Sequence, residues 1–140
     1  MQCDLLIPIA LENQIACKNA DKIKAKMVTE AANGPTTPEG DNVLYEKEIC
    51  VIPDGLANSG GVTVSYFERY QNLIREQWPP EKVNRKLEAK MSTAFKDVVA
   101  IAEKESSDMH TGALILGWGR FAIALKNYYS GHNTLALLKH

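Results

Sequence analysis

Three short apolar runs, each ended abruptly by turn residues, constrain the fold of this chain most. They are CDLLIPI (residues 3–9), KMVTEAA (26–32) and ICVIPD (49–54), and each is nearly continuous in apolar residues. Strands that are buried on both faces of a parallel sheet have this composition. The segments between the runs are long enough for helical crossovers. We therefore predict an α/β fold in which these runs form three parallel strands.

Helical patches are predicted between the strands, within residues 19–26 and 37–48. In the second patch Thr37 is a plausible N-cap and Pro38 occupies the first helical position. Alternation of strands and helices along the chain is typical of a layered α/β fold.

Two longer helices are predicted in the last third of the chain. Residues 80–105 place apolar side chains three and four positions apart, as on one face of an amphipathic helix. These side chains are Val83, Leu87, Met91, Phe95, Val98 and Ala102. A last helix over residues 110–128 is apolar on most sides, so we expect it to be buried or to lie against another surface.

Composition argues against several classes of protein. The net charge is −1 and the basic residues form no stripe, so nucleic-acid binding is not expected. The longest apolar run, residues 113–125, is too short to span a bilayer and contains Arg120. With no signal-peptide pattern and an odd number of cysteines, we expect a cytoplasmic protein. We expect Cys3, Cys17 and Cys50 to be reduced thiols, packed as small hydrophobic residues, with two of them in strands.

Each predicted strand is followed by a turn that contains an asparagine. These residues are Asn13, Asn33 and Asn58. Ligands of open parallel sheets bind outside the carboxyl ends of the strands, and asparagine offers both donors and an acceptor. Asparagine is also an ordinary turn former. Three such turns on one predicted edge favour a binding surface.

The stretch NSGGVTVSYFER, residues 58–69, is the most informative of these turns. Ser59 can cap a helix whose first N–H groups, at Gly60 and Gly61, would attract anions or carbonyl oxygens. Val62 and Ser65 lie three residues apart, so a hydroxyl next to an apolar wall could bind a carboxylate or an amide. The alternative is that Ser65 bonds back to its own helix backbone.

No residue is assigned as catalytic or as a metal ligand. His110, His132 and His140 show no metal-ligand spacing, and the last two are expected to be solvated. Asp54 could act as an acid or base but is more typical of a turn or a helix cap. The glycine-rich GxGxxG loop that binds a dinucleotide pyrophosphate is missing.

Three long motifs carry a family resemblance: CDLLIPIALENQI, EAANGPTTPEGD and VIPDGLANSGGVTVSYFE. They resemble the C-terminal, nucleotide-binding part of glutamate dehydrogenases, within the Glu/Leu/Phe/Val dehydrogenase family. The likeness weakens beyond residue 105. The VTVSYFE run favours glutamate over the branched-chain and aromatic substrates of related members. The resemblance implies NAD or NADP as cofactor and reversible oxidative deamination of glutamate to 2-oxoglutarate and ammonia.

The resemblance also implies cofactor contacts at the first two strand ends. Ala10 and Asn13 match the positions beside the adenosine or its ribose. Ala32 and Asn33 match the pair beside the nicotinamide ribose.

At the third strand end the resemblance implies contacts with both cofactor and substrate. Asn58, Gly60 and Gly61 match the loop that faces the nicotinamide and the backbone of the amino acid. Val62 matches the wall of the substrate pocket, and Ser65 the hydroxyl that binds the side-chain carboxylate.

The resemblance covers only part of the family's machinery. The family's acid–base lysine and aspartate belong to an N-terminal domain that we expect to be absent, so the chain alone should be inactive. Residues 1–140 are expected to be a partial NAD(P)-binding domain, the second half of a Rossmann-like doubly wound sheet. Strand and helix units would fill residues 1–58, and residues 59–140 would be mainly helical. An exposed strand 3–9 would then self-associate or pair with the missing half.

A different reading of the same features remains open. The chain could be a non-catalytic nucleotide-binding or subunit-interaction module, or a product without function, left from a truncated dehydrogenase gene.

Overall fold

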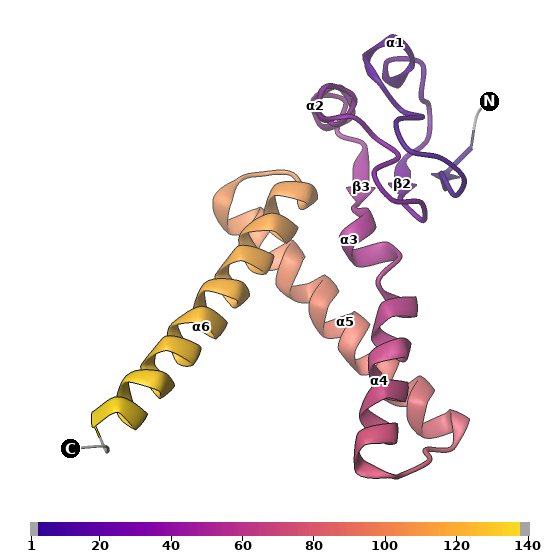
Figure 1. Cartoon of the computed structure of the whole chain (residues 1–140). Helices are drawn as coiled ribbons and strands as arrows, with labels where there is room; N and C mark the ends of the chain where they lie inside the picture. Colours follow the sequence, from indigo (N-terminus) through magenta and orange to yellow (C-terminus); the bar gives the residue numbers. More distant parts are fainter. Residues whose placement is uncertain (1–2, 138–140) are drawn as a thin grey trace.

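A three-stranded parallel sheet with helices around it forms the N-terminal part of the molecule (Figure 1). The structure, a computed structural model, describes residues 3–137, with side chains described through residue 130. The strands are β1 (Leu5–Leu6), β2 (Met27–Thr29) and β3 (Cys50–Ile52), in the order β1-β2-β3. The predicted α/β fold with three parallel strands is confirmed.

The strands are shorter and less buried than predicted. Val28 of β2 pairs with Leu6 of β1 and with Val51 of β3. Val28 and Val51 are buried, but Leu5 is 46% exposed. Burial on both faces is therefore a wrong expectation for this chain. The paired row Leu6, Val28 and Val51 faces the core, whereas the alternating row Leu5, Met27 and Cys50 on the opposite face is exposed or half-buried.

Two short helices, α1 (Cys17–Ala20) and α2 (Pro38–Glu46), pack against each other, and α2 packs on β3. The predicted cap of α2 is confirmed, because the Gly40 N–H donates to the Thr37 hydroxyl oxygen over 3.2 Å. The helix predicted over residues 19–26 is wrong in extent.

Asn19 fixes the start of α1, and turn bonds fix its end. Its side chain accepts from the Ala16 N–H at 2.8 Å and donates to the Gln14 carbonyl at 2.8 Å. These bonds satisfy backbone groups that precede the helix. Directly after Ala20 the backbone changes to tight turn bonds, from the Lys22 N–H to the Asn19 carbonyl at 3.0 Å and from the Ile23 N–H to the Ala20 carbonyl at 3.1 Å, and the helix ends there.

The hydrophobic core lies between the sheet and these two helices. Its buried members are Ile15, Ala20, Val28, Leu44, Ile49 and Val51. Leu44 of α2 is completely buried, so α2 is fixed directly to the sheet.

Gly40 allows α2 to lie against the chain that precedes α1. A Cβ added at Gly40 would lie 2.8 Å from the Ile15 carbonyl oxygen and 3.1 Å from the Ala16 Cα. Backbone atoms cannot move aside cheaply, so we expect Gly40→Ala to lower the free energy of unfolding by about 2 kcal/mol. Urea denaturation measures this loss. The control is Gly119→Ala, whose Cβ would contact nothing within 4 Å; an equal effect of both changes would contradict the packing described.

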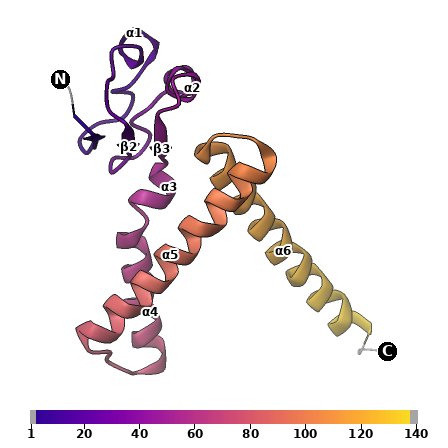
Figure 2. The ribbon, with the colours of Figure 1, turned by 180° about the vertical axis from the view of Figure 1, so that it is seen from behind.

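Four helices follow β3: α3 (Asp54–Ala57), α4 (Gly60–Ile74), α5 (Pro80–Glu105) and α6 (Met109–Leu137). The bounds of α5 are those predicted. Figures 1 and 2 show that α4 leads away from the sheet, that α5 crosses α4 on its way back toward the sheet, and that α6 runs outward again. No helix in the described part of the chain is long and apolar enough to cross a membrane.

The helices α5 and α6 meet near the sheet. Val98 and Ala102 of α5 are buried there, and a Cβ added at Gly112 of α6 would lie 3.1 Å from the Ala102 Cβ. Farther along, α6 exposes many large apolar side chains. They are Leu114, Ile115, Trp118, Phe121, Ile123, Leu125, Tyr128 and Tyr129. A buried α6 is therefore a wrong expectation, and the alternative, contact with another surface, stays a prediction.

The three cysteines are free, but they are not packed as small hydrophobic residues. Cys17 and Cys50 are exposed and Cys3 is half-buried. Only Cys50 lies in a strand, where side chains alternate between faces and its neighbour Val51 takes the inward position. The predicted burial of the cysteines, and the placing of two of them in strands, are wrong.

Candidate functional site

The loops that follow the three strands meet at one edge of the sheet. We call residues 7–16, 30–37 and 53–59 the first, second and third strand-end loops. The first and second are joined because the N–H groups of Ala31 and Ala32 both donate to the Pro8 carbonyl, at 3.0 and 2.9 Å. The carboxyl ends of parallel strands lie at the same edge, as the sequence implied.

Asn13 continues this contact between the first and second loops. Its N–H donates to the Gly34 carbonyl over 2.9 Å. Both residues have left-handed backbone conformations, with φ of 54° and 52°, which asparagine and glycine tolerate best. Ala10 of the same first loop is exposed, and Ala32 is buried beneath the second.

An amide pair joins the second and third loops. The Asn58 side-chain nitrogen donates to the Asn33 side-chain oxygen over 2.6 Å. The Asn33 nitrogen and the Asn58 oxygen have no other partner among the described residues, so one donor group and one acceptor stay available. A ligand that offers both hydrogen-bond donors and acceptors could bind to these two atoms.

Asp54 connects the same two loops by accepting hydrogen bonds from their backbone N–H groups. One carboxylate oxygen accepts from the Gly34 N–H at 2.8 Å and the other from the Gly55 N–H at 2.6 Å. Its carbonyl accepts from the Asn58 N–H at 3.0 Å. Asp54 therefore has the turn and capping role that its position favours.

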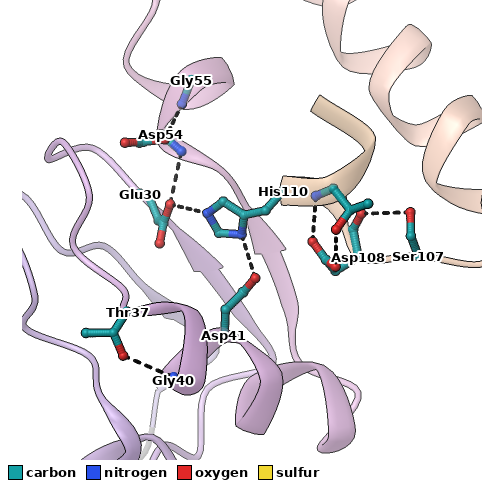
Figure 3. A network of polar contacts seen from close by, with 10 residues as sticks. Glu30, Thr37, Gly40, Asp41, Asp54, Gly55, Ser107, Asp108 and His110 are labelled. Carbon is teal, nitrogen blue, oxygen red and sulfur yellow. Dashed lines mark hydrogen bonds and ion pairs between the residues drawn. The ribbon is translucent and has the colours of Figure 1, made fainter. Parts of the chain in front are cut away.

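A buried carboxylate lies directly behind Asp54. The side chain of Glu30 is only 1% exposed, and its Oε2 accepts from the Asp54 N–H at 3.0 Å and from His110 Nε2 at 2.8 Å (Figure 3). The other ring nitrogen of His110, Nδ1, lies 3.0 Å from an Asp41 carboxylate oxygen. His110 thus connects the start of α6 to the end of β2 and to α2.

This arrangement favours a protonated imidazole. Burial opposes the charge on His110, but the hydrogen bonds and charges of Asp41 and Glu30 outweigh it and raise the pKa of the ring to about 10. Asp108 caps α6 by accepting from the Thr111 N–H at 2.8 Å. Burial alone would raise the pKa of Asp108, yet the bonds from Thr111 and the nearby His110 charge lower it.

Sequence reasoning missed this histidine. His110 and Glu30 are 80 residues apart, and no local pattern joins them. The sequence therefore assigned His110 no role. The expected solvation of His132 and His140 concerns side chains outside the described residues.

Donor atoms of Glu30, Asp54 and His110 lie within 4.8 Å of one another, and so do those of Asp41, Asp108 and His110. A metal would require a deprotonated ring nitrogen. Both ring nitrogens of His110 instead face carboxylates, as those of an imidazolium do.

The third loop leads into α4, whose N-terminus carries no side-chain cap. Ser59 occupies the capping position as predicted, but its hydroxyl donates to the Leu56 carbonyl at 2.8 Å. The first N–H groups of the helix, at Gly60 and Gly61, therefore receive no side-chain cap. A Cβ at Gly61 would contact nothing within 4 Å, so space exists beside it.

Val62 and Ser65 lie in the first two turns of α4, three residues apart on one face. Val62 is 76% exposed and Ser65 is also exposed. Among the described residues the Ser65 hydroxyl has no hydrogen-bond partner. The neighbouring Thr63 makes the bond to the helix backbone that was the alternative for Ser65, donating to the Ser59 carbonyl at 2.9 Å.

Known proteins similar to this chain form a consistent group. A family model described as Glutamate/Leucine/Phenylalanine/Valine dehydrogenase matches residues 1–128. The glutamate dehydrogenase of Thermotoga maritima is 51% identical over 126 residues, which are 90% of this chain and 30% of that protein. The NAD-specific glutamate dehydrogenase of Staphylococcus aureus strain COL is 47% identical over 126 residues, which are again 90% of this chain and 30% of that protein.

Solved structures agree with this group. The glutamate dehydrogenase of Peptoniphilus asaccharolyticus matches with a TM-score of 0.82 at 44% identity, covering 87% of this chain and 31% of that one. The hetero-hexameric glutamate dehydrogenase of Thermus thermophilus matches with a TM-score of 0.82 at 32% identity. The match covers 86% of this chain and 29% of that one. The chain spans about 30% of the length of the curated relatives it matches.

Proposed function

This chain belongs to the glutamate/leucine/phenylalanine/valine dehydrogenase family, and from that premise we propose that it works in the NAD(P)-dependent oxidative deamination of L-glutamate. In this proposal residues 1–140 are part of the NAD(P)-binding domain. Residues 1–58 supply the strand and helix units of the second half of the sheet, and residues 59–140 the mainly helical remainder. The acid–base residues come from the part of the family's length that this chain does not span.

The observation that carries the proposal is the amide pair of Asn33 and Asn58 beside the open N-terminus of α4. The free donor of Asn33 suits a hydroxyl of the nicotinamide ribose, and the free acceptor of Asn58 faces the nicotinamide. Ala32, small and buried next to Asn33, leaves room for the sugar. Ala10 and Asn13 of the first loop lie beside the adenosine part of the cofactor.

The substrate is proposed to lie along the start of α4. The open N–H groups at Gly60 and Gly61 face the backbone of the amino acid and the nicotinamide. Val62 forms an apolar wall, and the free hydroxyl of Ser65 donates to the side-chain carboxylate. When bound, the nicotinamide accepts a hydride from the α-carbon of glutamate. These residues hold the two reactants close together, which supplies much of the rate acceleration in such reactions.

The cofactor is NAD or NADP in this proposal, because the residues assigned here contact parts that both share. We place the protein in the cytoplasm, where the three free thiols stay reduced.

The alternative function is a non-catalytic module that binds nucleotide or pairs with dehydrogenase subunits. The exposed apolar side chains of α6 and of the edge strand β1 favour an interaction of this kind. Such a module would bind cofactor or subunits but would not restore turnover.

Complementation tests the proposal against this alternative. The chain would be co-expressed with the segment of the Thermotoga maritima glutamate dehydrogenase that precedes the matched region. We expect glutamate-dependent reduction of NAD or NADP from the assembly and from neither part alone. Asn33→Ala should weaken cofactor use, while the matched control Asn84→Ala, exposed on α5, should not. Assembly without any turnover would favour the non-catalytic module.

The exposed edge strand β1 leads us to predict self-association of the chain. Unpaired N–H and C=O groups on an apolar edge are a template for another chain, and β1 carries Leu5 at 46% exposure. We expect the isolated chain to self-associate and Leu5→Lys to reduce this association, as measured by analytical ultracentrifugation. Leu73→Lys, at an exposed position on α4, is the control. A monomeric unaltered chain at high concentration would contradict the prediction.

A further inference from the structure

We propose that His110 is a positioning residue for the cofactor amides, because through Glu30 and Asp54 it sets the spacing of the two loops that carry Asn33 and Asn58. The proposal deepens the proposed function and rests on it only for the expected effect on cofactor use. The spacing itself is a property of this chain alone.

The connection consists of short, consecutive contacts. His110 Nε2 lies 2.8 Å from Glu30 Oε2, and the same oxygen accepts from the Asp54 N–H at 3.0 Å. From Asp54, one bond leads to each side of the amide pair. Its carboxylate holds the N–H of Gly34, the residue after Asn33, and its carbonyl holds the N–H of Asn58.

Because Glu30 is buried, its orientation depends on the contact with His110. A carboxylate that is 1% exposed has little access to water, so its orientation depends on its protein partners. One oxygen of Glu30 serves both His110 and Asp54, and the other, Oε1, has no partner among the described residues. If the imidazole is lost, Glu30 loses its charged partner and can turn, and the Asp54 N–H loses its fixed acceptor.

The charges around His110 support this role. Four carboxylates face the ring: Glu30 at the end of β2, Asp41 on α2, Asp54 at the start of α3 and Asp108 before α6. With a pKa of about 10 the ring stays positive at neutral pH. The repulsion that these carboxylates would otherwise exert on one another is thereby offset where the loops meet.

A purely structural role for His110, as an anchor of α6, makes a different prediction. Anchoring of α6 would depend on the contacts of both ring nitrogens, with Glu30 and with Asp41. The positioning role depends only on the contact between Nε2 and Glu30. Asp41→Asn removes the charged partner that lies 3.0 Å from Nδ1 and leaves the contact between Nε2 and Glu30 in place. The two roles therefore differ in how Asp41→Asn compares with His110→Gln and Glu30→Gln.

The experiment follows the side-chain amide resonances of Asn33 and Asn58 and the exchange rate of the Gly34 N–H in the full chain by NMR. His110→Gln and Glu30→Gln should both shift these resonances and speed the exchange. Asp41→Asn and the control Arg120→Gln, which breaks an exposed ion pair elsewhere on α6, should leave them unchanged. Two results would overturn the proposal: unchanged amides in His110→Gln or Glu30→Gln, or an equal disturbance by Asp41→Asn. If His110→Gln fails to fold, Glu30→Gln decides the matter.

The assembled enzyme provides the second readout. His110→Gln is expected to raise KM for the cofactor by about 10- to 100-fold with a smaller change in kcat, as displaced binding groups do. An unchanged KM in an active assembly would overturn the proposal. If even the unaltered chain gives no active assembly, the proposed function fails, and the NMR comparison alone decides the positioning role.

Discussion

Replacing His110 by alanine is expected to lower the free energy of unfolding by about 3 kcal/mol at neutral pH, the cost of leaving a buried charge without its partner. Glu30 is 1% exposed and would keep its carboxylate in the interior without the imidazolium. We choose the lower end of the usual range because the His110 side chain is itself 27% exposed, so water can partly replace it. Urea denaturation of both chains measures the difference.

Arg120→Ala is the matched control for this change. The Arg120 guanidinium lies 2.8 Å from an Asp97 carboxylate oxygen on the exposed side of the helical pair. Such exposed ion pairs contribute less than about 1 kcal/mol. Equal losses from His110→Ala and Arg120→Ala would contradict the burial and coupling that we assign to His110.

The same residue predicts a pH dependence. The pKa of His110 is raised from 6.5 to about 10 in the folded chain, so the folded state binds this proton more tightly than the unfolded state. Its contribution to stability is complete below pH 6.5 and is lost as the pH rises through 10. We expect the difference in unfolding free energy between the unaltered chain and His110→Ala to shrink over that interval. A difference that grows with pH would contradict the assignment.

In the assembled enzyme, Ser65→Ala is expected to lower kcat/KM for glutamate by about 10- to 100-fold, because a hydrogen bond to a carboxylate is lost. The Ser65 hydroxyl has no partner within the described chain and is exposed, so its removal should not affect folding. The side-chain carboxylate is remote from the reacting carbon, so most of the loss should lie in KM. Steady-state kinetics with varied glutamate measures both parameters.

Ser92→Ala, at an exposed position on α5, should leave these kinetics unchanged. Two results would remove Ser65 from the substrate site: an unchanged KM for glutamate in Ser65→Ala, or an equal effect in both variants.

The elements that the sequence predicted well are those with strong local signals. The apolar spacing together with Pro79 and Pro80 defines α5, and Thr37 with Pro38 defines the start of α2. The convergence of the strand ends followed from parallel topology alone. The family resemblance then attached expected roles to residues at that edge.

The remaining features depend on contacts between distant parts of the chain. His110 meets Glu30 only because α6 begins beside the end of β2. The Ser59 hydroxyl turns to the Leu56 carbonyl because the short α3 precedes it. The exposed α6 shows that an apolar sequence can predict that a helix packs against another surface, but it does not identify that surface.

The measurement that tests the central claim most directly is the substrate preference of the assembled enzyme. Rates of NAD and NADP reduction would be compared for glutamate, leucine, valine and phenylalanine. We predict turnover with glutamate well above that with the three apolar amino acids, since Ser65 provides a hydroxyl for a side-chain carboxylate. Preference for an apolar amino acid, or no amino-acid-dependent turnover from a correctly assembled enzyme, would contradict the account.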